Sequence, residues 1–156
     1  LFVKNIPWGK LGLYPKSLLS GWWQIVLFNV FVLVLVQITI FYKIIDLPYW
    51  ITDKDPLILL LVIVLLQELI FRGIVISYFE RAGKQNALWL SVIIFLIFHM
   101  VTPYSWSVAG ISFALLTLVG GYFWGWHFLK YRNIYLLTIS HFLVNLSFNY
   151  LVFSTL

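Results

Sequence analysis

The chain has 156 residues, of which 63% are hydrophobic, and its mean hydropathy is +1.01. Charged residues make up 10% of it, against about 25% in an average soluble domain. This composition excludes a disordered chain, a collagen and a coiled coil, and the absence of cysteine excludes a disulfide scaffold. The net charge of +5 would favour nucleic acid in a soluble protein; here we assign it to membrane-flanking loops and expect no nucleic-acid partner.

Stretches without formal charge predict five transmembrane helices, because a helix needs about 20 apolar residues to cross the hydrocarbon core. In chain order we expect them at about 22–42, 57–79, 87–102, 107–128 and 134–153. Pro103 separates the third from the fourth, since proline disfavours helix in the residue before it. The sequence therefore predicts an all-α, polytopic membrane protein that forms one domain over residues 1–156.

The basic residues predict the orientation of these helices. With a cytoplasmic amino end, the inner loops hold most of them, as the positive-inside rule requires: Lys4, Lys10, Lys16, Arg81, Lys84, Lys130 and Arg132, against Lys43 and Lys54 outside. Residues 1–21 mix lysines with apolar side chains, which is typical of an interfacial segment. We expect a multi-pass protein of a cell membrane, the bacterial cytoplasmic membrane in view of the short chain.

Few polar side chains lie deep inside the predicted helices, and each is a candidate for function because ionisable groups there cost several kcal/mol. They are Gln67, Glu68, Arg72, His99, His141 and Asn145. Spacings of four residues predict a Glu68–Arg72 ion pair and place His141 and Asn145 on one helix face. Gln67 and His99 both lie 16 positions from Gly83, the turn of a helical hairpin, and therefore at one depth. His141 reaches about the same layer, which predicts one site on three helices.

Two further features of the fourth predicted helix receive structural interpretations. We assign His127, beside Trp124 and Trp126, to an aromatic belt at the cytoplasmic boundary. The G-x-x-x-G spacing of Gly121 and Gly125 favours close approach of a neighbouring helix.

Three motifs carry a resemblance to a known family. Residues 67–73 read Gln-Glu-Leu-Ile-Phe-Arg-Gly, residues 95–99 read Phe-Leu-Ile-Phe-His, and residues 141–145 read His-Phe-Leu-Val-Asn. In this order they resemble the E-E-x-x-x-R-G, F-x-x-x-H and H-x-x-x-N motifs of the CPBP (CAAX protease and bacteriocin-processing, or Abi) intramembrane endopeptidases. The resemblance covers a motif-bearing core at about residues 57–150.

The resemblance implies hydrolysis of a peptide bond inside the membrane, in a membrane-associated protein or peptide such as a CAAX protein, a bacteriocin or a leader peptide. It places Gln67 at the position of the general base and His99 as its helper, and it assigns His141 and Asn145 to the oxyanion. Amide hydrolysis needs such groups, a proton acceptor for water and donors for the developing negative charge. No cofactor is favoured, and the surrounding partner is membrane lipid.

Gln67 departs from the family motif, since a carboxamide cannot take a proton from water. Loss of a general base lowers the rate about 10²–10⁴-fold, so we predict an inactive or weakened enzyme. The glutamine was either introduced to trap an inactive state or arose as a natural loss, and the sequence leaves both open. A third explanation, that Glu68 takes over as general base, is the least favoured. One residue along a helix rotates the side chain by about 100°. Arg72 is expected to orient Glu68.

Three other functions compete with a glutamate-type protease. Glu68, His99 and His141 are candidate zinc ligands, although no H-E-x-x-H pattern is present and the resemblance favours a metal-independent reaction. The main alternative outside the enzymes is a non-catalytic Abi-type membrane scaffold that binds and regulates a partner protein. A small transporter with a proton relay is disfavoured, because the sequence has no inverted repeat.

Overall fold

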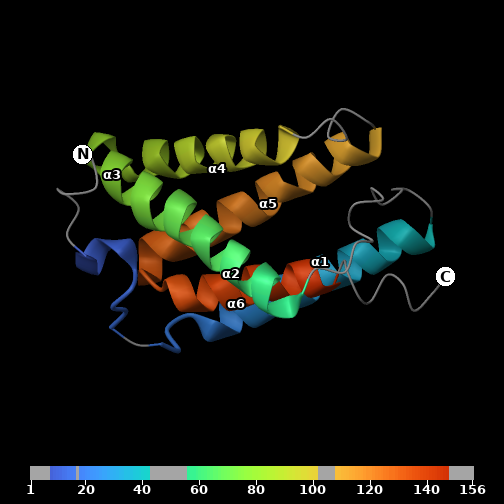
Figure 1. Ribbon diagram of the computed structural model, residues 1–156, viewed down its shortest axis with the longest axis horizontal. Helices are drawn as coiled ribbons and strands as arrows, with labels where there is room; N and C mark the ends of the chain where they lie inside the picture. Colours follow the sequence, from blue (N-terminus) through green and yellow to red (C-terminus); the bar gives the residue numbers. More distant parts are fainter. Residues whose placement is uncertain (1–7, 17, 43–55, 102–107, 148–156) are drawn as a thin grey trace.

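The computed structural model describes residues 8–16, 18–42, 56–101 and 108–147, and within these ranges it contains five helices and no strand (Figure 1). The first is α1 (Trp22–Phe41), preceded by a short 3-10 turn, η2 (Trp8–Leu11). One long helix then runs through α2 (Leu57–Glu68), the π-helical η4 (Leu69–Ile76), α3 (Ser77–Phe79) and the 3-10 turn η5 (Glu80–Ala82). The others are α4 (Lys84–Met100), α5 (Val108–Tyr131) and α6 (Ile134–Leu146). The predicted all-α fold is confirmed.

The helix boundaries agree with the sequence prediction except at the two turns of the predicted cytoplasmic end. α4 begins three residues early because Gly83, at φ 116°, makes the whole turn by itself. The Asn86 side chain then donates to the Ala82 carbonyl oxygen at 3.0 Å across that turn. α5 continues to Tyr131, beyond its apolar stretch, because a polar helix end can extend into solvent. Residues 148–153 of the last predicted helix lie outside the described residues.

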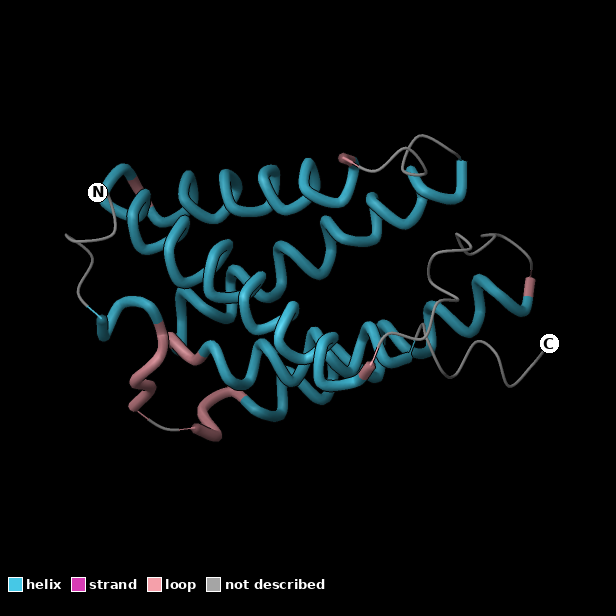
Figure 2. Tube along the Cα trace, viewed as in Figure 1, coloured by secondary structure: helices cyan, strands magenta, loops and turns pink. Residues whose placement is uncertain are grey.

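The helices form two pairs that are joined by the long helix. α4 and α5 run antiparallel along each other, and α1 and α6 lie side by side below them (Figures 1 and 2). The long helix packs on α4 through η4 and on α6 through α2, so its middle faces both pairs. The α4–α5 contact is close at Gly125, where an added Cβ would lie 2.4 Å from Leu88 Cδ1. The interpretation of the G-x-x-x-G spacing as helix packing is confirmed.

The molecule has polar groups in its centre and apolar groups on its outside. Glu68, Arg72 and Ser91 are each 0% exposed. By contrast, the outer face of α2 exposes large aliphatic side chains, with Ile58 at 70% and Leu66 at 50%. A water-soluble protein has the opposite distribution, since large contiguous apolar surfaces mark contacts with membranes or other proteins.

One helix of the described residues, Leu57–Ala82, is long and apolar enough to cross a membrane by length and composition. Trp22–Ile38, Lys84–Met100 and Ile134–Leu146 are apolar but shorter, at 10–17 residues each. The structure thus supports a helical protein with one qualifying span, and the five-span arrangement stays a prediction.

The segment before α1 closes one end of the bundle through its backbone oxygens. The Lys10 carbonyl accepts from Ser77 Oγ at 2.7 Å, and the Leu18 carbonyl accepts from Asn133 Nδ2 at 2.8 Å. Leu11 is only 3% exposed. This segment was predicted to be interfacial; the structure adds that it packs on the helix ends, while its position in a membrane stays a prediction.

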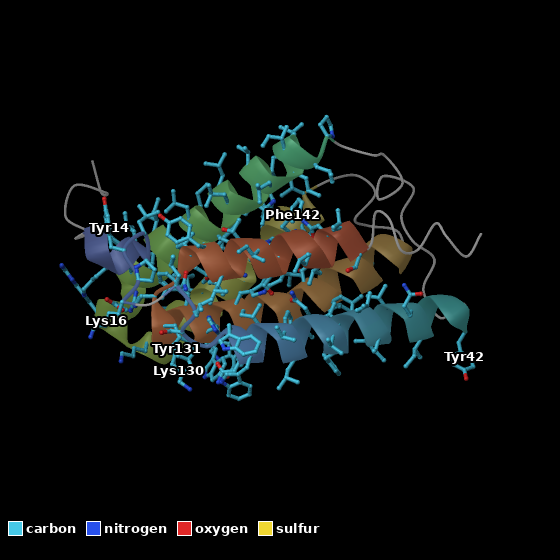
Figure 3. All side chains as sticks on the ribbon, turned by 90° about the horizontal axis from the view of Figure 1, so that it is seen from below. Tyr14, Lys16, Tyr42, Lys130, Tyr131 and Phe142 are labelled. Carbon is cyan, nitrogen blue, oxygen red and sulfur yellow. The ribbon has the colours of Figure 1, made fainter. Side chains whose placement is uncertain are left out.

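Basic residues gather at this same end. Glu80 forms ion pairs with Lys10, at 2.7 Å, and with Arg132. Figure 3 shows Lys16 and Lys130 at this end, with Tyr42 at the other. The grouping agrees with the charge pattern used to predict a cytoplasmic face.

Candidate active site

Three side chains from two helices meet in a buried centre. Glu68 ends α2, Arg72 lies in η4, and His141 lies in α6. Glu68 Oε1 is 3.3 Å from Arg72 Nη1 and 2.8 Å from His141 Nδ1. The Glu68–Arg72 pair predicted from spacing is therefore present, and the same carboxylate oxygen ties it to a second helix. Glu68 Oε2 is buried and has no hydrogen-bond partner within the described part of the chain.

The guanidinium of Arg72 contacts two neighbouring helices, α4 and α5, in addition to Glu68 of its own helix. Its carbon lies 4.2 Å from the ring centroid of Phe95 and 5.5 Å from that of Trp124. Nη2 also donates to the Gly121 carbonyl at 3.5 Å. Aromatic faces attract a cation, so they add to the compensation that Glu68 supplies. Arg72 lies within the π-helical η4, and π-helical turns occur frequently at functional sites.

A cavity of about 60 Å³ adjoins the centre, which is room for about two to four water molecules. Its polar lining residues are His99, His141 and Asn145, which were predicted to share one site, and Thr117. The remaining lining residues are supplied mainly by α1 and α5: Phe28, Phe31, Val32, Leu35 and Val36 from α1, and Leu116, Val119, Gly120 and Trp124 from α5.

Phe95 connects the two histidines of the cavity. Its carbonyl oxygen accepts a hydrogen bond from His99 Nδ1 at 2.8 Å. Its ring lies 4.4 Å from the His99 ring and 5.8 Å from the His141 ring, with both pairs edge to face. Because a carbonyl can only accept, this bond places a hydrogen on His99 Nδ1.

Gln67, like Glu68 and Arg72, is not among the residues that line the cavity. Its side-chain oxygen is buried and has no hydrogen-bond partner among the described residues. Its neighbour Glu68 points instead to His141, as the rotation of about 100° per residue requires. The structure thus brings together Glu68, Arg72, His99, His141 and Asn145, and the catalytic roles of all six residues stay predictions.

Sequence reasoning missed a second polar chain beside His141. The Trp124 ring stacks on the His141 ring at 4.3 Å, with 22° between the planes. Trp124 Nε1 donates to Ser140 Oγ at 2.9 Å, and Ser140 Oγ donates to Asn29 Oδ1 at 2.7 Å. Trp124 therefore fixes the plane of His141 and joins α5, α6 and α1 at the cavity.

The assignment of His127 to an aromatic belt at the boundary is wrong. His127 is 0% exposed, and its Nε2 lies 3.2 Å from the Gly21 carbonyl oxygen. Trp124 is 3% exposed, whereas Trp126 is 37% exposed. The reason is that the segment leading into α1 covers this face of α5, a long-range contact that local composition cannot reveal.

The described residues contain no group of three or more His, Cys, Asp or Glu side chains placed to hold a metal ion. Of the suggested zinc ligands, Glu68 and His141 bond to each other, and His99 Nδ1 bonds to a backbone oxygen. With these contacts, the three side chains do not form a set of zinc ligands among the described residues. The effect of a chelator on activity tests the zinc alternative.

Polar motif residues of α4 and α6 line one cavity, and those of the long helix lie beside it. The family model for Rce1-like type II CAAX prenyl endopeptidases matches residues 55–147. The chain belongs to this family, and the CPBP resemblance is confirmed. No curated protein and no solved structure matches the chain.

Proposed function

We propose that this chain is a multi-pass intramembrane endopeptidase of the CPBP type, weakened by the glutamine at position 67. The observation that carries the proposal is the cavity on which His99, His141 and Asn145 converge beside the buried Glu68–Arg72 pair. Family membership supplies the reaction class, hydrolysis of a peptide bond. The substrate is a membrane-associated protein or peptide, of the CAAX, bacteriocin or leader type.

The membrane setting is supported by the distribution of polarity. Every described helix exposes large apolar side chains, from Trp23 of α1 to Leu143 of α6, while ionised groups occupy the interior. Lipid tails accept such a surface, and a buried ion pair avoids contact with them. The end with Lys10, Lys16 and Arg132 then faces the cytoplasm, in the bacterial cytoplasmic membrane.

The site can supply most of what amide hydrolysis requires. The cavity has room for a water and a carbonyl group, and apolar walls strengthen the electrostatic interactions inside it. The Asn145 amide can donate to the oxygen that becomes negative as water adds. A carboxylate at position 67 would accept the water proton in the family's assignment, and Gln67 cannot. The reaction is therefore expected to be slow.

The test restores the missing carboxylate. Gln67→Glu and the unsubstituted chain, both in nanodiscs, are compared on a library of fluorogenic membrane peptides, each with and without a chelator. We expect Gln67→Glu to raise kcat about 10²–10⁴-fold and the activity to survive chelation. Gln85→Glu is the matched control, since Gln85 is exposed in the first turn of α4. Activity lost to the chelator would establish the zinc alternative instead.

A non-catalytic scaffold that regulates a partner protein is the second candidate, and Gln67 itself favours it. If folded Gln67→Glu hydrolyses no peptide in the library, proteolysis is refuted. A specific partner that co-purifies with the unsubstituted chain would then support the scaffold.

A further inference from the structure

The ring of His141 is held from two sides. Glu68 Oε1 contacts its Nδ1 at 2.8 Å and so fixes the position of one ring atom. The Trp124 ring lies 4.3 Å away with 22° between the two planes, and so fixes the tilt of the His141 ring. The terminal torsion of a histidine has a broad energy minimum, so its contacts decide where the ring points. The direction of Nε2 therefore depends on Trp124 as well as on Glu68.

Trp124 is itself oriented by a chain of hydrogen bonds that runs in one direction. Its indole N–H can only donate, and it donates to Ser140 Oγ at 2.9 Å. The Ser140 hydroxyl has one hydrogen, which it donates to Asn29 Oδ1 at 2.7 Å. Ser140 is 0% exposed and Trp124 is 3% exposed, so bulk water does not replace either bond. The chain therefore ends on the amide oxygen of Asn29.

Asn29 decides which way the Ser140 hydroxyl points. Hydroxyl side chains in helices often donate to the carbonyl four residues back in their own helix. Thr138 does so at 2.9 Å, and Ser147 does so at 2.7 Å. Ser140, by contrast, donates to a different helix. Removal of the Asn29 oxygen lets Ser140 turn to its own helix, and Trp124 then loses its fixed acceptor.

Asn29 comes from a helix that carries none of the three motifs. It lies in α1, which runs beside α6 (Figure 1). The preceding residue, Phe28, is buried against α5. Its ring stacks on the Phe123 ring at 3.9 Å and meets the Trp124 ring edge to face at 5.8 Å. These two neighbouring side chains therefore fix α1 against both α5 and α6 at the level of Trp124.

We propose that Asn29 is a positioning residue of the active site, which sets the orientation of the His141 ring through this hydrogen-bond chain. The inference rests on the proposed endopeptidase function, in which the resemblance assigns His141 and Asn145 to the oxyanion. Groups that stabilise such a charge are effective because they are held in position beforehand. A displacement of about 1 Å can cost 10²-fold in rate. Asn29 thus acts on kcat without contacting substrate.

The test measures kcat and KM of Asn29→Leu on one peptide in nanodiscs, in the Gln67→Glu background that carries the family's carboxylate. Leucine has nearly the shape of asparagine but no acceptor. We therefore expect kcat to fall about 10–100-fold while KM stays within about twofold, the pattern of an interaction that serves the transition state. Gln37→Leu makes the matched change elsewhere in α1 and should leave both constants nearly unchanged.

A second background separates positioning from packing. Trp124→Phe keeps an aromatic ring beside His141 but cannot donate to Ser140, so the chain is already broken. In this background Asn29→Leu should lower kcat less than about twofold, because coupled residues are not additive. If Asn29 only packed α1 against the bundle, its loss would lower kcat by the same factor in both backgrounds. Asn29→Ala, which also removes the oxygen, enters the same cycle if Asn29→Leu does not fold.

The orientation of the ring is also measured without activity. An indole face shields the hydrogens that are stacked on it. The ring hydrogens of His141 should therefore give signals at low chemical shift in ¹H–¹³C spectra of the histidine-labelled, unsubstituted chain, with His141→Gln for assignment. Asn29→Leu should move these signals toward the ordinary histidine shift, and Gln37→Leu should leave them in place.

Each outcome decides the inference. Equal kcat factors in the two Trp124 backgrounds overturn it, and so do His141 signals or a kcat that Asn29→Leu leaves unchanged. A rise in KM alone would make Asn29 a binding residue and would overturn it as well. Inactivity of Gln67→Glu itself refutes the endopeptidase function, whereas failure of the inference alone leaves Gln67→Glu active.

Discussion

Arg72→Met tests whether the buried ion pair stabilises the fold as its geometry indicates. Methionine keeps a long unbranched side chain but leaves Glu68 as a buried charge. At an effective dielectric constant of about 20, unit charges 3.3 Å apart attract by about 5 kcal/mol. Removing one partner of a buried pair typically costs about 3–5 kcal/mol. His141 still donates to Glu68, so we expect a loss near the lower limit, about 3 kcal/mol.

The assay is equilibrium unfolding in mixed micelles with increasing dodecyl sulfate, followed by tryptophan fluorescence. Arg72→Met combined with Glu68→Gln leaves no buried charge, and a glutamine oxygen can still accept from His141. The double variant should therefore lose less free energy of unfolding than the sum of the two single variants. Additive losses, or a loss below about 1 kcal/mol for Arg72→Met, would refute this account of the pair.

Two predictions concern packing and capping and use the same unfolding assay. Gly125→Ala should lose about 1–3 kcal/mol, because its Cβ would lie 2.4 Å from Leu88 Cδ1. Combined with Leu88→Ala it should lose less than the sum of the two, and strict additivity would contradict the clash. Asn133→Ala should lose about 1 kcal/mol, because Asn133 Oδ1 accepts from Leu136 N at 3.2 Å at the start of α6. Asn133→Ser keeps an acceptor for that N–H and should fall between the two. Equal stability of all three proteins would refute the cap.

The sequence was sufficient for features that depend on local pattern. Apolar runs located the helices, and Gly83 marked the hairpin. The spacing of Glu68 and Arg72 gave their pairing, because neighbours four apart on a helix meet whatever surrounds them. Equal depth brought His99 and His141 to one cavity, since helices in an antiparallel bundle share a common axis direction.

What the sequence did not reveal depends on contacts between distant segments. The π-helical segment Leu69–Ile76, which contains Arg72, has no signature in hydrophobic periodicity. The sequence does not distinguish Trp124 from a tryptophan at a membrane boundary. The structure shows that it hydrogen-bonds to Ser140 of α6, which in turn hydrogen-bonds to Asn29 of α1. Only a tertiary structure shows these pairings, because each residue is unremarkable in its own segment.

The wall that α1 gives to the cavity has a consequence for how the shape of the cavity is encoded. The family match begins at residue 55, so α1 lies outside it, although Phe28, Phe31 and Val36 line the cavity. Part of the cavity wall is therefore specified by a stretch of chain outside the one that carries the motifs. Exchange of α1 would reshape that part of the wall while every motif residue stays in place, so identical motifs are compatible with cavities of different shape.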